Sequence, residues 1–306
     1  MTYVYPTYYP DFACIASACR HSCCVGWEID IDGDTYEAYQ AVGGEMGERL
    51  KRSISEDGVP HFILDKEERC PFLNRQGLCE LILSLGEDSL CEICREHPRY
   101  YNRLSDCLEV GLGLCCEEAA RLILTQKEPL SLVSEGEGSI TEWERECLTA
   151  RERTMARLQD RAMPIRVRMD ELSEGVFLSI EDAIAFFLTF EIMDEAWREL
   201  LLAFRFPSED ELSAFSRHMT AREHEYENFA VALLFRYAVT ADDREDLRRK
   251  LLFPAFSASL LYQLGAFLYA ERGTFTVSDQ IELVRLFSSE IEYDEDNLSA
   301  LLWRLS

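Results

Sequence analysis

Cysteine is the residue type best placed to do chemistry in this chain, because its side chains are concentrated in one part of the sequence. Of the 12 cysteines among 306 residues, all but Cys147 fall in the first 116 positions. They are Cys14, Cys19, Cys23, Cys24, Cys70, Cys79, Cys91, Cys94, Cys107, Cys115 and Cys116. Thiolates at this spacing can converge on one ion or cluster through short loops, and soft sulfur ligands favour zinc or iron–sulfur over hard cations. The sequence therefore predicts a soft-metal site.

Two other uses of these cysteines stay open at this point. They could be reduced thiols buried for structural reasons, or they could form disulfides on oxidation. The N-terminal segment 1–10 has neither the basic stretch nor the apolar core of a secretory signal. This favours a reducing compartment, and with it metal ligation over disulfides.

The spacing of the cysteines does not select the metal. Cys91-x2-Cys94 is typical of half a zinc site, whereas the remaining thiols could equally hold a four-iron cluster. The radical-SAM spacing C-x3-C-x2-C is not met, because Gly26 stands where a third cysteine would have to follow Cys23. His21 and His97 lie inside the cysteine segments and could each replace a thiolate, although His97 is better interpreted as a packing residue.

The charge balance limits the classes of partner. Lys and Arg number 31 and Asp and Glu number 57, so the formal net charge is −26 at pH 7. Such a negative field disfavours nucleic acid and anionic membranes as partners. A hydrophobic fraction of 47% with 29% charged residues is ordinary for a folded globular protein. Since no run of about 20 apolar residues stands out, we expect a soluble cytoplasmic protein, whose oligomeric state the sequence leaves open.

The distribution of turn residues and apolar residues predicts a mainly α protein in two parts. Residues 1–125 carry the cysteines and many turn signals, which indicates a metal-binding module of short helices and loops. Residues 126–139, with Pro129, two glycines and several serines and acids, are typical of a linker or exposed loop. From residue 140 to 306 apolar residues recur at helical spacing, so we expect an all-α helical bundle there.

Helix boundaries in this second part can be predicted from capping signals. Ser179 followed by Asp182 resembles a capping box for a helix running to about Phe204, and Ser208 with Glu211 does the same for the next helix. The apolar periodicity predicts further helices at 142–160, 221–240, 243–271, 278–290 and 295–305.

Familiar enzyme motifs are missing from the sequence. There is no G-x4-G-K-[ST] phosphate loop and no G-x-S-x-G nucleophile elbow. The segment Glu109–Gly113 is faintly similar to the glycine-rich turn of a nucleotide site, but it lacks the third glycine and the following βαβ pattern. Any catalysis must therefore use a less common scaffold.

The cysteine motifs and several helical motifs together resemble the bacterial flagellin lysine-N-methylase family. The likeness covers nearly the whole chain. It includes Phe12-Ala13-Cys14-Ile15, Cys19-Arg20-His21-Ser22-Cys23-Cys24-Val25-Gly26-Trp27, Cys70-Pro71-Phe72-Leu73-Asn74, Gly77-Leu78-Cys79, Cys94-Arg95-Glu96-His97-Pro98-Arg99 and Cys116-Glu117-Glu118-Ala119-Ala120-Arg121. It continues through Tyr226-Glu227-Asn228-Phe229, Leu234-Phe235-Arg236 and Phe287–Tyr293.

The resemblance implies an iron–sulfur protein, with a 4Fe-4S cluster or alternatively zinc, that transfers methyl groups from S-adenosylmethionine to surface lysines of flagellin. The cysteines that match the family pattern, and so the metal ligands that it implies, are Cys14, Cys19, Cys23, Cys24, Cys70, Cys79, Cys94 and Cys116. Cys91, Cys107, Cys115 and Cys147 fall outside the pattern. The chain also departs from it at Glu117, where proline is usual, and at Ser289 and Tyr293, where arginine and histidine are usual.

The matching motifs contain the candidate site residues. Glu227, Glu290 and Glu292 are the candidates for positioning or deprotonating the substrate amine, since a lysine must lose its proton before it attacks a sulfonium methyl. The alternative for each is a solvated acid on a helix face.

Three arginines inside the motifs are candidates for binding the methyl donor. Arg99, Arg121 and Arg236 could hold its carboxylate, or could pair with neighbouring acids in so acidic a protein. The competing hypothesis for the whole chain is a non-enzymatic zinc- or iron-binding, delivery or redox protein.

Overall fold

The computed structural model describes residues 1–305, and contacts within the chain divide it into two compact units. One unit, here the helical unit, combines Met1–Phe12 with the chain from Tyr101 onward. The other, here the cysteine unit, is Ala13–Tyr100. The division therefore differs from the expected one at residues 126–139, because residues 101–125 contribute to the sheet and the core of the helical unit.

A four-stranded sheet lies in the helical unit. Its strands are β1 (Thr2–Pro6), β4 (Arg99–Arg103), β5 (Cys107–Leu112) and β6 (Leu132–Glu135), in the order β4-β5-β1-β6. Strand β1 is parallel to β5 and antiparallel to β6. The glycine-containing segment from Glu109 is thus strand rather than a nucleotide-binding turn, and the expected linker contains β6.

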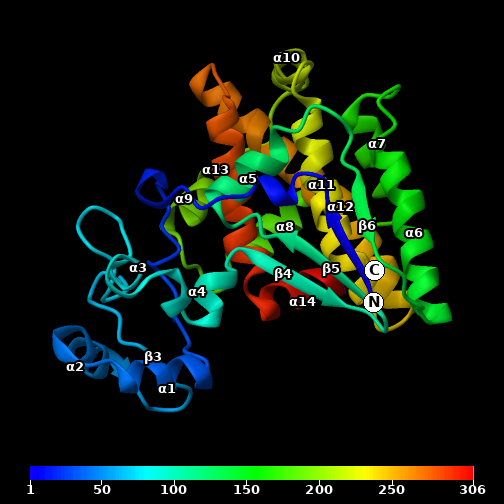
Figure 1. Ribbon diagram of the computed structural model, residues 1–306. Helices are drawn as coiled ribbons and strands as arrows, with labels where there is room; N and C mark the ends of the chain where they lie inside the picture. The colour runs from blue at the N-terminus through cyan, green and yellow to red at the C-terminus, as the bar shows by residue number, and fades with distance from the viewer. Residues whose placement is uncertain (306) are drawn as a thin grey trace. The chain divides into compact units, whose positions relative to one another are not determined.

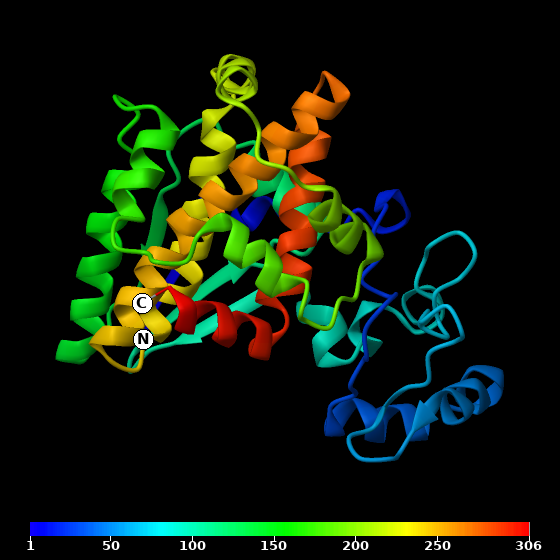
Figure 2. The same cartoon turned by 180° about the vertical axis from the view of Figure 1, so that it is seen from behind.

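The rest of the helical unit is α-helical, which confirms the mainly α prediction. The helices are α5 (Glu117–Leu124), α6 (Glu142–Leu158), α7 (Ile165–Leu172), α8 (Ile180–Phe187), α9 (Glu195–Ala203), α10 (Glu209–Met219), α11 (Glu223–Tyr237), α12 (Arg244–Arg272), α13 (Val277–Phe287) and α14 (Glu295–Arg304). Both views of the ribbon show α11 and α12 through the centre of this unit, with α6 and α7 along one side and α13 on the other (Figures 1 and 2). A π-helical turn, Ser288–Glu292, joins α13 to α14.

Capping explains where several helices begin. Thr141, Ser208 and Thr276 each form a reciprocal capping box, so the predicted pairing of Ser208 with Glu211 is confirmed. The predicted cap at Ser179 is confirmed, since its hydroxyl accepts the backbone N–H of Asp182, but the single helix predicted from there to about Phe204 is wrong. It is divided into α8 and α9, because Asp194 caps a new helix and the backbone N–H groups of Met193 and Asp194 donate to the buried Glu290.

Aromatic side chains fill the core of the helical unit. Phe287 lies at its centre, with ring centroids 5.7 Å from Phe229 and 6.3 Å from Trp197. Helix α12 is long and apolar enough to cross a membrane by length and composition, but 78% of its apolar window is buried inside the unit. Burial of this kind is what the central helix of a folded core requires.

Gly265 allows α12 to pack closely against α11. A Cβ atom at this position would lie 2.6 Å from the Tyr226 hydroxyl and 3.1 Å from the ring of Phe215.

We expect Gly265→Ala to lower the free energy of unfolding by about 1–3 kcal/mol through overpacking, although alanine is the better helix former. Chemical denaturation would measure this, with Gly33→Ala as the control, since nothing lies within 4 Å of that Cβ position. Equal stability of both variants would contradict the packing argument.

The cysteine unit contains short elements around a small core. They are α1 (Gly33–Ala41), α2 (Gly44–Ser53), β2 (Ile54–Ser55), β3 (His61–Phe62), α3 (Glu80–Leu85) and α4 (Glu92–Glu96). Phe62 and Phe72, at most 1% exposed, pack with the buried thiols of Cys70 and Cys91. This core contains few apolar residues for a unit of this size.

Candidate functional site

Five thiols gather in the core of the cysteine unit. Cys70 and Cys91 are buried there, and Cys24, Cys79 and Cys94 pack against the same core half-buried. We call these five residues the thiol cluster. Four of them are among the predicted ligands, whereas Cys91 stood outside the family pattern. Spacing alone could have found Cys91, because it forms the C-x2-C pair with Cys94.

The pKa values in the thiol cluster reflect this crowding. Burial, together with the nearby Cys24, Cys79 and Cys91, raises the pKa of Cys70 to about 12. A hydrogen bond between the side chains of Cys94 and Cys91 lowers the pKa of Cys91 and raises that of Cys94. A cation bound among the sulfurs would relieve their mutual repulsion, so the donor set is chemically suited to a soft metal.

The other four predicted ligands lie outside the thiol cluster. Cys14 is exposed, the amide of Ala16 donates to its sulfur over 3.4 Å, and Cys19 donates to the carbonyl of His21 over 3.2 Å. Cys23 contacts Cys24, whose pKa it lowers to about 7 by hydrogen bonding. Cys116 belongs to the helical unit, where it is the residue before α5.

The sulfurs of the thiol cluster are not drawn together around a point. Across residues 1–305, no three His, Cys, Asp or Glu side chains converge closely enough to hold a metal ion as they stand. Burial lowers the pKa of His97 to about 4, and its ring packs 5.5 Å from that of Trp27. The packing interpretation of His97 fits this environment better than metal ligation.

Two of the three candidate glutamates are fully engaged in structural contacts. Glu227, with 0% exposure, accepts hydrogen bonds from Arg161 at 2.8 Å and Arg168 at 2.7 Å. Glu290 accepts the backbone N–H of Asp194 at 2.6 Å and of Met193 at 3.2 Å. These glutamates hold helices in place, so the solvated alternative fits neither of them.

Glu292 is different, because one of its carboxylate oxygens is buried without a hydrogen-bond partner. Oε2 accepts from the Tyr237 hydroxyl at 3.0 Å and from Arg236 Nη1 at 3.3 Å. Oε1 has no partner of normal hydrogen-bond geometry among residues 1–305, and neither has the hydroxyl of Ser288 nearby. Burial raises the pKa of Glu292 above its usual value.

The arginines predicted to bind the methyl donor differ in their partners. Arg121 makes a bidentate pair with Glu118 one turn earlier on α5, at 2.7 and 2.5 Å. Arg236 pairs with Glu292 and lies over two aromatic rings, 5.2 Å from the centroid of Tyr237 and 5.4 Å from that of Tyr293. Arg99 begins β4. The alternative of pairing with neighbouring acids therefore describes both Arg121 and Arg236.

A buried ion pair and the neighbours of Glu292 were not predicted from the sequence. Glu109 on β5 and Arg151 on α6 form two hydrogen bonds, of 2.6 and 2.7 Å, with side chains only 1% and 4% exposed. Tyr237, and Cys115 through its hydrogen bond with Tyr293, complete the surroundings of Glu292. No local pattern marks such residues, because their partners lie far away in the sequence.

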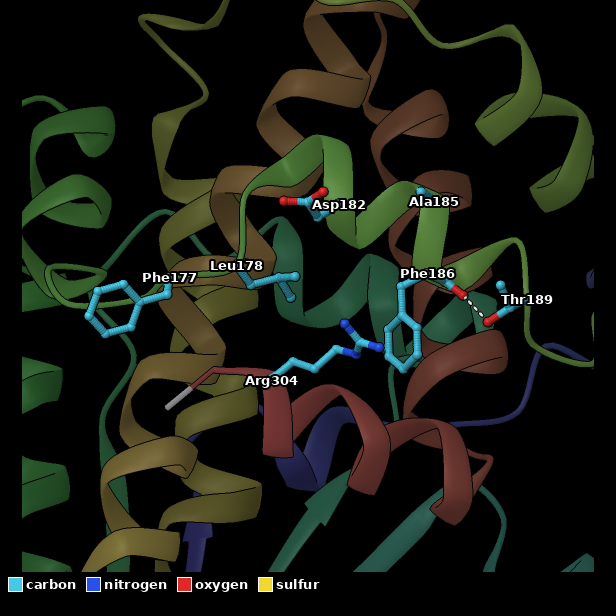
Figure 3. Close-up of a pocket in the computed structure, with 7 residues that line it drawn as sticks. All are labelled: Phe177, Leu178, Asp182, Ala185, Phe186, Thr189 and Arg304. Carbon is cyan, nitrogen blue, oxygen red and sulfur yellow. Dashed lines mark hydrogen bonds between the residues drawn. The ribbon is translucent and has the colours of Figure 1, made fainter.

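A cavity of about 500 Å³ opens elsewhere in the helical unit, between α8 and the end of α14. Figure 3 shows Arg304 extending across it toward Phe186, with the guanidinium carbon 3.8 Å from the ring centroid. Phe177, Leu178 and Asp182 also line it. None of the predicted site residues, all of which are within the described chain, contributes to its wall.

Comparison with known proteins relates the second half of the chain to a known protein family. The sequence model of the FliB lysine N-methylase C-terminal domain matches residues 153–305. A Lysine-N-methylase of Salmonella choleraesuis (strain SC-B67) is 29% identical over 146 residues, covering 43% of this chain and 35% of that protein. The "Flagellar biosynthetic protein FliU" of Salmonella muenchen is 27% identical over 145 residues, covering 43% of this chain and 82% of that protein.

These comparisons have a limited span. The match covers only 35% of the length of the Salmonella lysine-N-methylases. No solved structure matches the chain significantly. The family match itself extends over half of the chain, from α6 through α14, and includes Glu227, Arg236, Glu290 and Glu292. The chain therefore belongs to the FliB lysine N-methylase family.

Proposed function

We propose that the protein is a lysine N-methyltransferase that methylates flagellin, with S-adenosylmethionine as the methyl donor, in the cytoplasm before the flagellin is exported. The observation that carries this proposal is the family match over residues 153–305. Relatives named Lysine-N-methylase and a flagellar biosynthetic protein support it. The net charge of −26 suits a substrate whose reactive side chain is cationic.

The reaction itself requires a neutral amine. The ε-ammonium loses a proton, its nitrogen forms a bond to the methyl carbon, and the carbon–sulfur bond breaks with its electron pair remaining on sulfur. The products are the methylated lysine, a neutral thioether and one proton. An enzyme must therefore favour the free amine and hold it in line with the methyl group.

We propose further that the thiol cluster binds a 4Fe-4S cluster, with zinc as the alternative. Cys24, Cys70, Cys79, Cys91 and Cys94 would supply the ligands, and metal binding would draw their sulfurs together. When bound, the group would cross-link loops whose own core is small. Cys14 and Cys23 are less suited as primary ligands, since both are exposed, and Cys19 and Cys116 do not pack in the core that holds the thiol cluster.

The carboxylate of the methyl donor needs a cationic partner. The predicted arginines differ in the contacts that they would have to give up to bind it. Arg121 and Arg236 would each have to exchange a glutamate for the ligand. Arg99, at the start of β4, is the third candidate.

Two measurements on the full chain test the proposed function. Protein purified without oxygen is analysed for iron, zinc and sulfide, and then incubated with flagellin and S-adenosylmethionine. A mass increase of one or more methyl groups on flagellin lysines, located by peptide mass spectrometry, is expected. A protein that retains metal but transfers no methyl groups to flagellin would favour the metal-binding or redox alternative.

A further inference from the structure

Glu292 combines two features that mark functional sites independently of the family match. It ends the π-helical turn Ser288–Glu292, a rare backbone form that occurs frequently at functional sites. Its side chain is 1% exposed, yet Oε1 lacks a hydrogen bond of normal geometry with any described residue, although the Ser288 hydroxyl lies close enough to the carboxylate to lower its pKa. A buried carboxylate oxygen without a partner is costly, so its presence calls for a ligand or a catalytic use.

The other carboxylate oxygen is held firmly. Tyr237 and Arg236, both from the end of α11, donate to Oε2. The backbone carbonyl of Arg236 accepts a hydrogen bond from Asn102 at 2.8 Å, which ties this end of α11 to β4. The carboxylate is therefore oriented before any substrate arrives, and Oε1 remains available to accept a proton.

Two neighbours of this carboxylate are partly exposed to solvent. Arg236 is 19% exposed and stacks with Tyr293, which is 36% exposed. Because Oε1 is buried, side chains around it must move before an amine can reach it. The positive charge of Arg236 would also favour the neutral form of an amine beside it, as cationic neighbours do for reactive lysines.

We propose that Glu292 is the general base for the substrate lysine, with Oε1 receiving the ε-ammonium proton while Arg236 and Tyr237 hold Oε2. This inference rests on the proposed function. The N–H bond breaks and an O–H bond forms at Oε1. The freed nitrogen lone pair then attacks the sulfonium methyl of the donor, and the carboxyl proton is released to solvent.

The charged and titratable groups around Glu292 agree with this role. Arg236 and Tyr237 face it from α11, Cys115 from the loop before α5, and Tyr293 from its own segment. Burial raises the pKa of Glu292 above its usual value, which makes it a stronger base than an exposed glutamate.

The test is the pH dependence of methyl transfer by Glu292→Gln and wild-type protein. Near pH 7.5, kcat of the variant is expected to fall about 10²–10⁴-fold, the usual contribution of a general base. This deficit should shrink as the pH rises toward the lysine pKa of about 10.4, because the substrate then deprotonates without help. A merely structural role predicts a deficit that does not depend on pH.

Glu225→Gln is the matched control. Glu225 lies on α11 and, like Glu292, is buried, with 1% exposure, and its carboxylate receives two hydrogen bonds of 2.7 Å from Arg222. The Glu225→Gln variant should retain the wild-type kcat per folded molecule. If Glu292→Gln does not fold, Tyr237→Phe replaces it. Loss of the Tyr237 hydroxyl removes a hydrogen bond to the carboxylate, so the acidic limb of the pH profile should move to higher pH.

The outcomes separate the two proposals. An active wild-type protein together with a fully active Glu292→Gln variant, or an unshifted profile for Tyr237→Phe, would overturn the role of Glu292 alone. A wild-type protein that binds neither S-adenosylmethionine nor flagellin would overturn the proposed function and this inference together.

Discussion

Replacing Cys91 with serine is expected to reduce bound iron or zinc at least tenfold, whereas Cys14→Ser should leave the metal content nearly unchanged. Cys91 has 0% exposure in the core of the thiol cluster, while Cys14 is exposed at the surface. Removing a residue that only hydrogen-bonds to a metal ligand already costs about 10–100-fold in metal affinity, so loss of a ligand should cost at least as much. Metal analysis of protein purified without oxygen measures the effect.

The result distinguishes the ligand set that the thiol cluster suggests from the ligand set that the family pattern implies. The family pattern includes Cys14 and omits Cys91. Cys147→Ser is the control, because this thiol is as buried as Cys91 but lies in the helical unit. If Cys14→Ser loses the metal and Cys91→Ser retains it, the ligands lie nearer the N-terminus than the thiol cluster and our assignment fails.

The second large effect is expected from Glu109→Gln, which should lower the free energy of unfolding of the helical unit by about 3–5 kcal/mol. The substitution leaves the guanidinium of Arg151, 4% exposed, without the charge that compensates its burial. Thermal and denaturant unfolding, followed by far-ultraviolet circular dichroism, would measure the loss.

Two comparisons test this explanation. Glu146→Gln breaks the exposed pair with Arg244, whose side chains are 41% and 81% exposed, and should cost no more than about 1 kcal/mol. The double variant Glu109→Leu with Arg151→Met should recover much of the loss, since buried ion pairs can often be replaced by apolar contacts. Similar destabilisation by Glu109→Gln and Glu146→Gln would show that burial is not the cause.

The helices of the second half could be predicted because their signals are local. Apolar periodicity and capping residues mark α6 and α10 through α14 within a residue or a few at each end. The break between α8 and α9 could not be predicted in this way, because Glu290, nearly 100 positions later, accepts the backbone hydrogens there. The sheet escaped prediction for the same reason, since β1 pairs with residues 107–109 and 132–135.

The candidate site was predictable by residue type but not by role. Glu227, Glu290 and Glu292 all stand in matching motifs, yet only the folded chain gives the first two complete sets of hydrogen-bond donors and leaves Oε1 of Glu292 without one. Tyr237 was not predicted, because its contact with Glu292 spans 55 positions. Hydrogen-bond satisfaction, and not residue identity, distinguishes the three acids.

The placement of β1 has a consequence for synthesis of the chain on the ribosome. Strand β1 is made before the cysteine unit, but β5 and β6, between which it lies, follow only after that unit. At about 5–20 residues per second, translation separates the strand from its partners by several seconds. The cysteine unit thus leaves the ribosome, and has the opportunity to acquire metal, while β1 is still unpaired. Until β5 and β6 have been made, β1 is an unpaired strand that is available for aggregation.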